Sequence, residues 1–296
     1  MEIKSLLKIT QVKSIITILL APIFLGAVES FYKFDLINIP LFLYTALIVI
    51  LAGIAVNSYH VLSLYKHKWF FELEMIKGIK TQIPLKLVRI LAVSTLSIAI
   101  LMVVILYQFT TLGVIFPFAL ALLLFFLYAV GPKPLWQTSL NELVYSFGVG
   151  YFVTVFITYS QVYFEVTNIL SFYILILWVS LPVVLALACM QFVYNQKLAE
   201  YNDKMTTMAT MMGFNTTFMV MEIATGLACL LPCIAIYLND MPWTVIFIWL
   251  MYPKLVINLR KYLQTTKTDL QMYYVRQNVY IIIVFQLLLT IFGIFF

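Results

Sequence analysis

The sequence predicts an all-α protein that crosses a membrane several times. Hydrophobic residues make up 64% of the chain and charged residues only 10%, whereas a soluble domain has about 25% charged residues. The mean hydropathy is +1.04. The chain shows no repeated segments of alternating hydrophobicity, which a transmembrane β-barrel requires. Helices are then the expected way to pair every backbone N–H and C=O group within lipid.

Nine apolar stretches are long enough to cross a bilayer, whose hydrocarbon core of ~30 Å requires about 20 helical residues. The stretches cover residues 14–32, 39–59, 87–107, 113–130, 140–160, 169–193, 217–238, 243–263 and 279–296. The fourth is the shortest, and Pro253 and Lys254 interrupt the eighth. We therefore predict a nine-helix bundle that forms one integral membrane domain over residues 1–296.

The basic residues predict the orientation of this bundle. With the N-terminus in the cytoplasm, 17 of the 18 Lys and Arg residues fall on the cytoplasmic side, and Lys33 alone falls on the other. Short cytoplasmic loops are enriched in Lys and Arg, so we predict that the N-terminus and the polar loops are cytoplasmic. A bacterial cytoplasmic membrane is the expected location. This distribution explains the net charge of +6 without a nucleic-acid partner.

Polar residues concentrate on the predicted cytoplasmic side, in segments 57–86, 131–141 and 195–213. Loops held by a rigid frame commonly carry function. Asn57 lies at the end of the second apolar stretch, and Asn195 follows directly after the sixth. The two ends predict a pair of related half-sites around a central cavity, although Asn at a helix end also serves as a cap.

Four short motifs occur in a characteristic order along the chain. They are Ala-Pro-Ile-Phe-Leu-Gly-Ala at 21–27, Tyr-Ala-Val-Gly-Pro-Lys-Pro-Leu at 128–135, Leu-Asn-Glu-Leu at 140–143, and Thr-Met-Ala at 207–209 followed by Gly213. Together they resemble the UbiA superfamily of intramembrane prenyltransferases, in particular the branch that prenylates dihydroxynaphthoate in menaquinone synthesis. The resemblance covers nearly the whole chain and implies a UbiA-type bundle.

The resemblance also implies a reaction. In this family a polyprenyl diphosphate ionises to an allylic cation, which an aromatic acceptor captures. Mg²⁺ neutralises the departing diphosphate, and carboxylates hold the metal because Mg²⁺ prefers hard oxygen ligands. The family supplies these carboxylates as Asn-Asp-x-x-Asp-x-x-x-Asp after the second helix and Asp-x-x-x-Asp after the sixth.

The chain departs from both acidic motifs. Asn57 is kept in the first motif, but Ser58, Val61 and Tyr65 replace its three aspartates. In the second motif the aspartate positions fall on Gln196 and Glu200, or on Ala199 and Asp203 in a gapped alignment. Loss of one charge-stabilising group typically costs about 2.7–4 kcal/mol of transition-state stabilisation. We therefore expect weak or absent Mg²⁺-dependent catalysis.

Basic side chains near the motifs offer direct partners for phosphate in place of the metal. The candidate substrate- or diphosphate-binding residues are Asn57, Ser58, His60, Lys66, Lys68, Tyr128, Lys133, Asn195, Gln196 and Lys204. The candidate metal ligands are Glu200 and Asp203. No catalytic residue is assigned.

Two functions stay open at this level. In the first, the protein is a prenyltransferase that joins a polyprenyl chain to an aromatic acceptor, with Mg²⁺ as cofactor if it is active. Alternatively, it is a degenerate homologue that binds an isoprenoid or quinone-like lipid without catalysis. The lipid bilayer is a partner in both.

Overall fold

The computed structural model describes residues 6–7, 10–66, 85–131, 134–199, 206–265 and 268–295. Helices account for most of these residues, and no strand occurs among them. The predicted site residues Lys68, Lys133, Glu200, Asp203 and Lys204 lie outside the described part of the chain.

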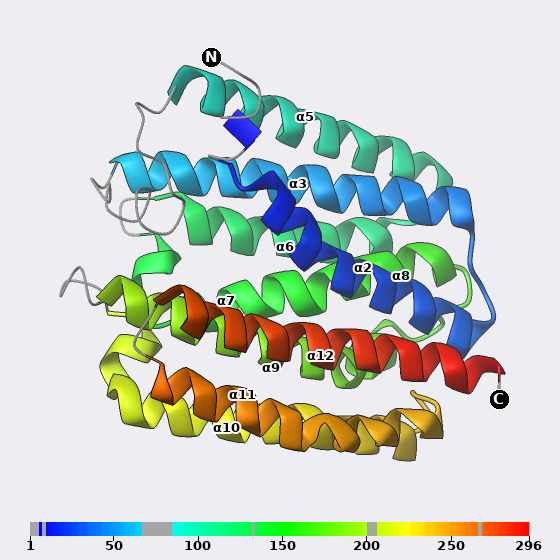
Figure 1. Ribbon diagram of the computed structural model, residues 1–296. Coiled ribbons are helices and arrows are strands. Elements are labelled where there is room, and N and C mark those ends of the chain that lie inside the picture. The colour runs from blue at the N-terminus through cyan, green and yellow to red at the C-terminus, as the bar shows by residue number, and fades with distance from the viewer. Residues whose placement is uncertain are drawn as a thin grey trace.

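The described helices form nine rods that alternate in direction (Figure 1). The first four rods are α2 (Val12–Phe34), α3 (Ile39–Lys66), α5 (Leu85–Phe109) and α6 (Leu112–Ala129). After the short 3₁₀ turn η1 (Leu135–Gln137), the fifth rod joins α7 (Asn141–Ser146), the π-helical η2 (Phe147–Phe152) and α8 (Val153–Val162). The remaining rods are α9 (Ile169–Ala199), α10 (Met208–Tyr237), the 3₁₀ segment η3 (Trp243–Met251) with α11 (Tyr252–Gln264), and α12 (Thr268–Phe295).

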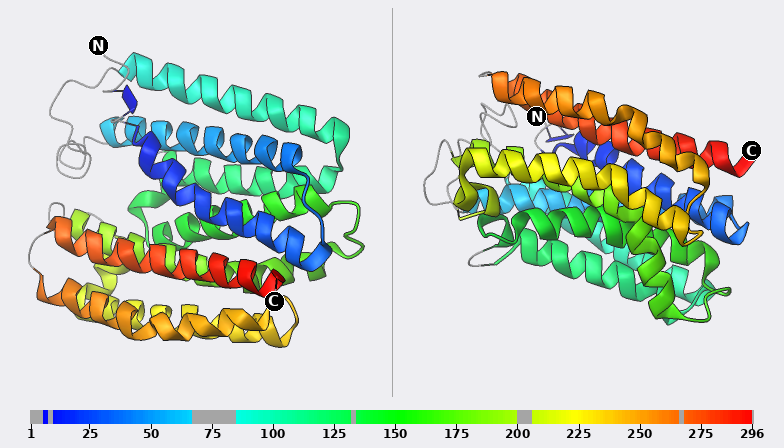
Figure 2. Two further views of the ribbon diagram at one scale, coloured as in Figure 1. Left: turned by 45° about the vertical axis from the view of Figure 1, so that its right-hand side comes forward. Right: turned by 90° about the horizontal axis from the view of Figure 1, so that it is seen from below.

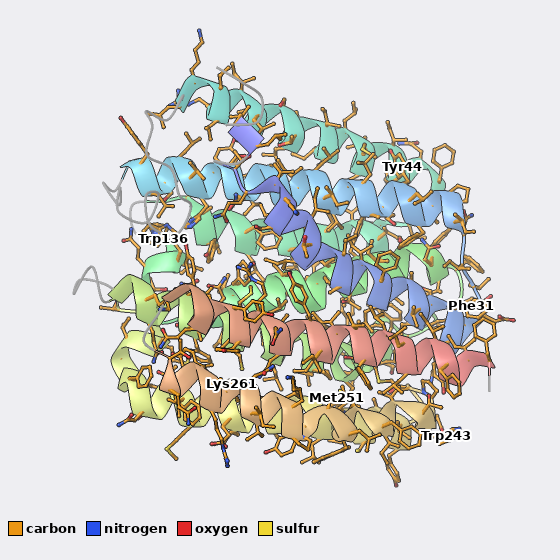
Figure 3. The ribbon with its side chains drawn as sticks, in the orientation of Figure 1. Phe31, Tyr44, Trp136, Trp243, Met251 and Lys261 are labelled. Atoms are coloured by element: carbon orange, nitrogen blue, oxygen red, sulfur yellow. The ribbon has the colours of Figure 1, made fainter. Side chains whose placement is uncertain are left out.

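The structure confirms the predicted all-α membrane architecture. Among the described residues, eight helical spans are long and apolar enough to cross a bilayer. The ninth predicted span is the rod formed by η3 and α11. Figure 3 places Trp243 and Lys261 toward opposite ends of this rod. Pro253 lies at the start of α11, where proline is tolerated because the first-turn N–H groups have no intrahelical acceptor.

The predicted loops that begin at residues 57 and 195 are wrong in the structure. Helix α3 continues to Lys66 and α9 continues to Ala199, so Asn57 and Asn195 lie inside helices. Hydropathy marks the part of a helix that lies in lipid, but a helix continues for as long as its backbone groups pair internally. We call the end of the bundle where α2, α5, α7, α10 and α12 begin the polar end, and the opposite end the far end.

Helix α8 lies at the centre of the bundle, and every one of its residues is buried. Helix α5 packs on α3 at one edge, and α10 and α11 form the other edge (Figure 2). Helix α2 crosses close to α8 at Gly26, whose carbonyl accepts a hydrogen bond of 3.2 Å from Thr158 Oγ1. Small residues allow such close contacts between membrane helices.

An ion pair joins two helices at the far end. Lys33 Nζ, in the last turn of α2, lies 2.8 Å from Asp240 Oδ1 and also donates to the Asn239 carbonyl. Asn239 and Asp240 form the turn between α10 and η3. The pair therefore ties the end of α2 to this turn.

The contact at Gly26 generates a stability prediction. A Cβ at this position would lie 2.9 Å from Ile157 Cβ and 3.0 Å from the Thr154 carbonyl oxygen. Gly26→Ala must therefore push α2 away from α8, and we expect a loss of about 1–3 kcal/mol of stability. Thermal unfolding of the purified protein in detergent measures this loss.

The matched control is Gly226→Ala in α10, where the nearest atoms to a new Cβ are those of Tyr252, 3.9 Å away. This variant should melt at the wild-type temperature or slightly above it, because alanine favours helix more than glycine does. Equal melting temperatures for Gly26→Ala and the wild type would contradict the close contact between α2 and α8.

Candidate functional site

A cavity of about 760 Å³ lies between α2, α3, α9 and α12. This volume lies within the usual range for small-molecule sites. Its lining changes in character along its length. We call the part lined by Lys13, Asn57, His60, Gln191, Tyr194 and Arg276 the polar section, and the part lined by Leu20, Phe24, Ile283, Val284 and Leu287 the apolar section.

The apolar section lies between α2 and α12, which are neighbours in the bundle (Figures 1 and 2). Three of its side chains are also exposed on the side of the bundle: Leu20 is 38% exposed, Phe24 46% and Val284 49%. The cavity therefore opens sideways between these two helices. In a membrane, this opening would face lipid tails.

The polar section carries two cations. Lys13 lies in the first turn of α2, Arg276 lies in the early part of α12, and both side chains are exposed. Within the described residues, no Asp or Glu lines the cavity. The described side chains of this section therefore carry a net positive charge.

The described residues do not fit a Mg²⁺ site at this cavity. Mg²⁺ is usually held by one or two carboxylates, and the described lining offers amides, hydroxyl groups, an imidazole and two cations instead. The described part of the chain also contains no cluster of three or more His, Cys, Asp or Glu residues that could hold a metal. Glu200 and Asp203 lie outside this part, so their assignment as metal ligands stays a prediction.

Helix α3 presents only part of its predicted motif to the cavity. Asn57 and His60 line the cavity, and the Asn57 amide donates to the Thr10 carbonyl in the segment before α2. His60 is almost buried, and its ring centre lies 5.4 Å from those of Tyr128 and Trp136. Figure 3 places Trp136 at the polar end.

The side chains at the three positions where the family carries aspartate point away from the cavity. Ser58 is buried and donates to the Ile54 carbonyl in the preceding turn. Val61 is buried in an apolar cluster that contains Trp136. Tyr65 is 40% exposed and lines a separate, smaller pocket. None of the three lines the cavity.

Asn195 takes part in a buried network at the polar end. Its Nδ2 donates to Glu142 Oε1 at 2.8 Å, and its Oδ1 accepts from Asn141 Nδ2 at 2.9 Å. All three side chains are almost completely buried. Asn195 therefore connects α9 to α7, and it does not line the cavity.

Glu142 also closes the N-terminus of α10. Its Oε1 accepts from the Ala209 backbone N–H at 3.1 Å, and its Oε2 accepts from that of Met208 at 3.4 Å. A carboxylate is favourable here because a helix N-terminus carries partial positive charge. Gly213, with φ of 73°, interrupts the regular helix soon afterwards. The sequence motif at 140–143 contains Glu142, but sequence reasoning assigned it no role.

The structure distributes the other predicted site residues over several places. Tyr128 lines the cavity and packs against Tyr145, with ring centres 5.9 Å apart. Gln196 accepts a hydrogen bond of 2.7 Å from the buried Tyr262 hydroxyl. Lys66 ends α3 and lines the smaller pocket. Asn57, His60 and Tyr128 are therefore the predicted residues that meet at the cavity.

Of the six residues that define the polar section, sequence reasoning missed four: Lys13, Gln191, Tyr194 and Arg276. In the sequence, Lys13 and Arg276 were used only to predict the orientation of the bundle, because each precedes an apolar stretch. No motif marks Gln191. Its position one helical turn before Asn195 is the only sequence signal near it.

No protein-family profile matches the chain, and no curated protein sequence matches it. Solved structures do. One, described in connection with digeranylgeranylglyceryl phosphate synthase in membranes, matches with a TM-score of 0.67 and 15% identity over 98% of each chain. The apo structure of a UbiA homologue from Aeropyrum pernix K1 matches with a TM-score of 0.68 and 12% identity, over 96% of this chain and 98% of that one. The fold is of the UbiA type. The UbiA-type bundle predicted from sequence is therefore confirmed.

The buried network generates a prediction for this UbiA-type bundle. Asn195→Ala removes one donor from the Glu142 carboxylate and leaves the Asn141 amide without its acceptor on α9. We expect a loss of about 2 kcal/mol of stability, because hydrogen bonds to charged groups contribute about 1.5–3 kcal/mol. Thermal unfolding in detergent measures the change.

Asn215→Ala is the control, because Asn215 is exposed on α10 and exposed substitutions usually change stability by less than about 0.5 kcal/mol. If both variants melt together with the wild type, the network does not stabilise the bundle.

Proposed function

We propose that this chain is a UbiA-superfamily member that binds a polyprenyl diphosphate and transfers the polyprenyl chain to an aromatic acceptor of the dihydroxynaphthoate type. The two-part cavity carries this proposal. Lys13 and Arg276 supply positive charge at one end, and the slot between α2 and α12 supplies an apolar surface that is open to the side. An isoprenoid diphosphate has the same division into an anionic head and a long apolar chain.

The family likeness and the local motifs support the reaction class. In such a transfer the bond between C1 of the prenyl chain and the diphosphate oxygen breaks, and the electron pair leaves with the diphosphate. A ring carbon of the acceptor then bonds to C1 and the ring loses a proton. In this chain Lys13 and Arg276 would hold the leaving group, and the slot would orient the chain. The described residues fit no Mg²⁺ site, so no step is assigned to a metal.

A second function is favoured by one observation, the missing carboxylates in the described lining of the cavity. On this proposal the protein binds an isoprenoid or quinone-like lipid and performs no chemistry. The same bundle serves both proposals. In each, the polar end faces the cytoplasm, and a bacterial cytoplasmic membrane is the proposed location.

Prenyl transfer by the purified protein in detergent separates the two proposals. Farnesyl and longer diphosphates are supplied with dihydroxynaphthoate, with Mg²⁺ or with EDTA. The proposed transfer predicts product with little dependence on Mg²⁺, because the described lining has no carboxylate, whereas the second function predicts binding without product. Product that vanishes with EDTA would support a metal-dependent transferase and make Glu200 and Asp203 the first sites for substitution. Absence of both diphosphate binding and product would overturn the first proposal and would restrict the second to a quinone-like lipid.

The apolar section generates a second test. Ala21, in α2, lines the cavity and is 7% exposed. Ala21→Phe places a ring in the space that the prenyl chain would fill, so we expect the affinity for geranylgeranyl diphosphate to fall by about tenfold, equal to about 1.4 kcal/mol. Equilibrium binding in detergent measures the change.

The matched control is Ala119→Phe in α6, where the alanine is exposed on the side of the bundle and does not line the cavity. Its affinity should equal that of the wild type. Unchanged affinity in Ala21→Phe would place the prenyl chain outside this slot.

A further inference from the structure

We infer that the cavity holds the phosphate head of an isoprenoid ligand directly on Lys13 and Arg276, without a bridging metal ion. This inference rests on the proposed function, because it assumes that the slot between α2 and α12 takes a prenyl chain. It adds how the head is recognised and which chemical class of head is accepted, namely a phosphate or diphosphate ester.

Lys13 lies where a cation is unfavourable in the absence of an anion. The first turn of α2 contains no acidic residue, and a helix N-terminus already carries partial positive charge. Gln11, at the N-cap, makes no side-chain hydrogen bond to the helix and also lines the cavity. The start of α2 thus adds its own positive field to that of Lys13.

Arg276 brings a second cation to the same cavity from a different helix. The ion pair between Lys33 and Asp240 is the one salt bridge formed within the described residues. Neither Lys13 nor Arg276 is therefore neutralised by a carboxylate there. A guanidinium group matches phosphate geometry with two parallel hydrogen bonds, whereas an ammonium group acts as a point charge.

A buried amide adds to the polar lining at this place. Gln191, in α9, is 6% exposed and lines the cavity, and its Oε1 has no hydrogen-bond partner among the described residues. Buried polar groups are normally paired. The Gln191 side chain also hydrogen-bonds with that of Tyr145, so it adds a buried amide to the polar wall of the cavity.

The charges decide between metal-bridged and direct binding. A metal bridge requires protein carboxylates on one side of the ion and phosphate oxygens on the other. The described lining supplies cations in place of those carboxylates, and they would repel a divalent metal ion. A diphosphate needs no such bridge, because it accepts hydrogen bonds directly from cationic side chains. Binding should therefore resist EDTA and weaken with salt.

The experiment measures equilibrium binding of geranylgeranyl diphosphate to the full chain in detergent, with excess EDTA or with Mg²⁺. Geranylgeraniol, the uncharged alcohol, is the matched probe. We expect the same Kd for the diphosphate with EDTA and with Mg²⁺. Lys13→Gln and Arg276→Gln should each raise this Kd by about tenfold and leave the Kd for geranylgeraniol unchanged. The alcohol also verifies that each variant is folded.

Lys86→Gln and Arg260→Gln are the controls for general electrostatics, because both side chains are exposed and neither lines the cavity. Both should bind the diphosphate as the wild type does. Competition by inorganic diphosphate that is lost in Arg276→Gln would support recognition of the head alone. If inorganic diphosphate does not compete, the prenyl chain is required for head binding. The Kd of geranylgeranyl diphosphate in Lys13→Gln and Arg276→Gln then decides the inference.

Two results would overturn the inference: loss of diphosphate binding with EDTA, or wild-type diphosphate affinity in the double variant of Lys13 and Arg276. Both results require that geranylgeraniol still binds, so the proposed lipid site survives them. If the wild type binds neither probe, the proposed function itself fails.

Discussion

The carboxylate of Glu142 joins three helices at the polar end, and the shape of the cavity depends on it. A buried charge is stable only when hydrogen bonds replace its lost water. Asn195 and two backbone N–H groups at the start of α10 supply these bonds. The network fixes α9 relative to α7 and α10, and α9 in turn carries Gln191 and Tyr194 to the cavity wall.

With α9 fixed, the cavity separates into two chemically different sections. The cations and polar groups lie toward the polar end, where α2 begins, and the apolar slot continues between α2 and α12. This arrangement matches an amphiphile that enters from the side with its head toward the polar end. A metal held by carboxylates would require acidic side chains in this lining, and the described lining contains none.

The sequence predicts the bundle well because the bilayer thickness sets the length of each apolar stretch, and the stretches can then be located one by one. It predicts the helix ends less well, because α3 and α9 continue past the residues at which hydropathy falls. The residues of the site are harder still to predict. Each residue turns a helix by about 100°, so Asn57 faces the cavity while Ser58 faces the packed interior. Asn195 resembles Asn57 in sequence, but its partner Glu142 is visible only in three dimensions.

The orientation of α3 about its own axis limits any attempt to restore the family's acidic motif by mutation. Aspartate at Ser58 or Val61 would enter tightly packed surroundings without a partner, which is strongly unfavourable. Aspartate at Tyr65 would lie at the smaller pocket. A carboxylate site in the cavity would instead need Asp or Glu in place of Asn57 or His60. The alternative is a rotation of α3 about its axis, which would change its packing against α5 and α6. Three substitutions separate this stretch from the acidic motif, but with α3 packed as it is here their side chains would not line the cavity.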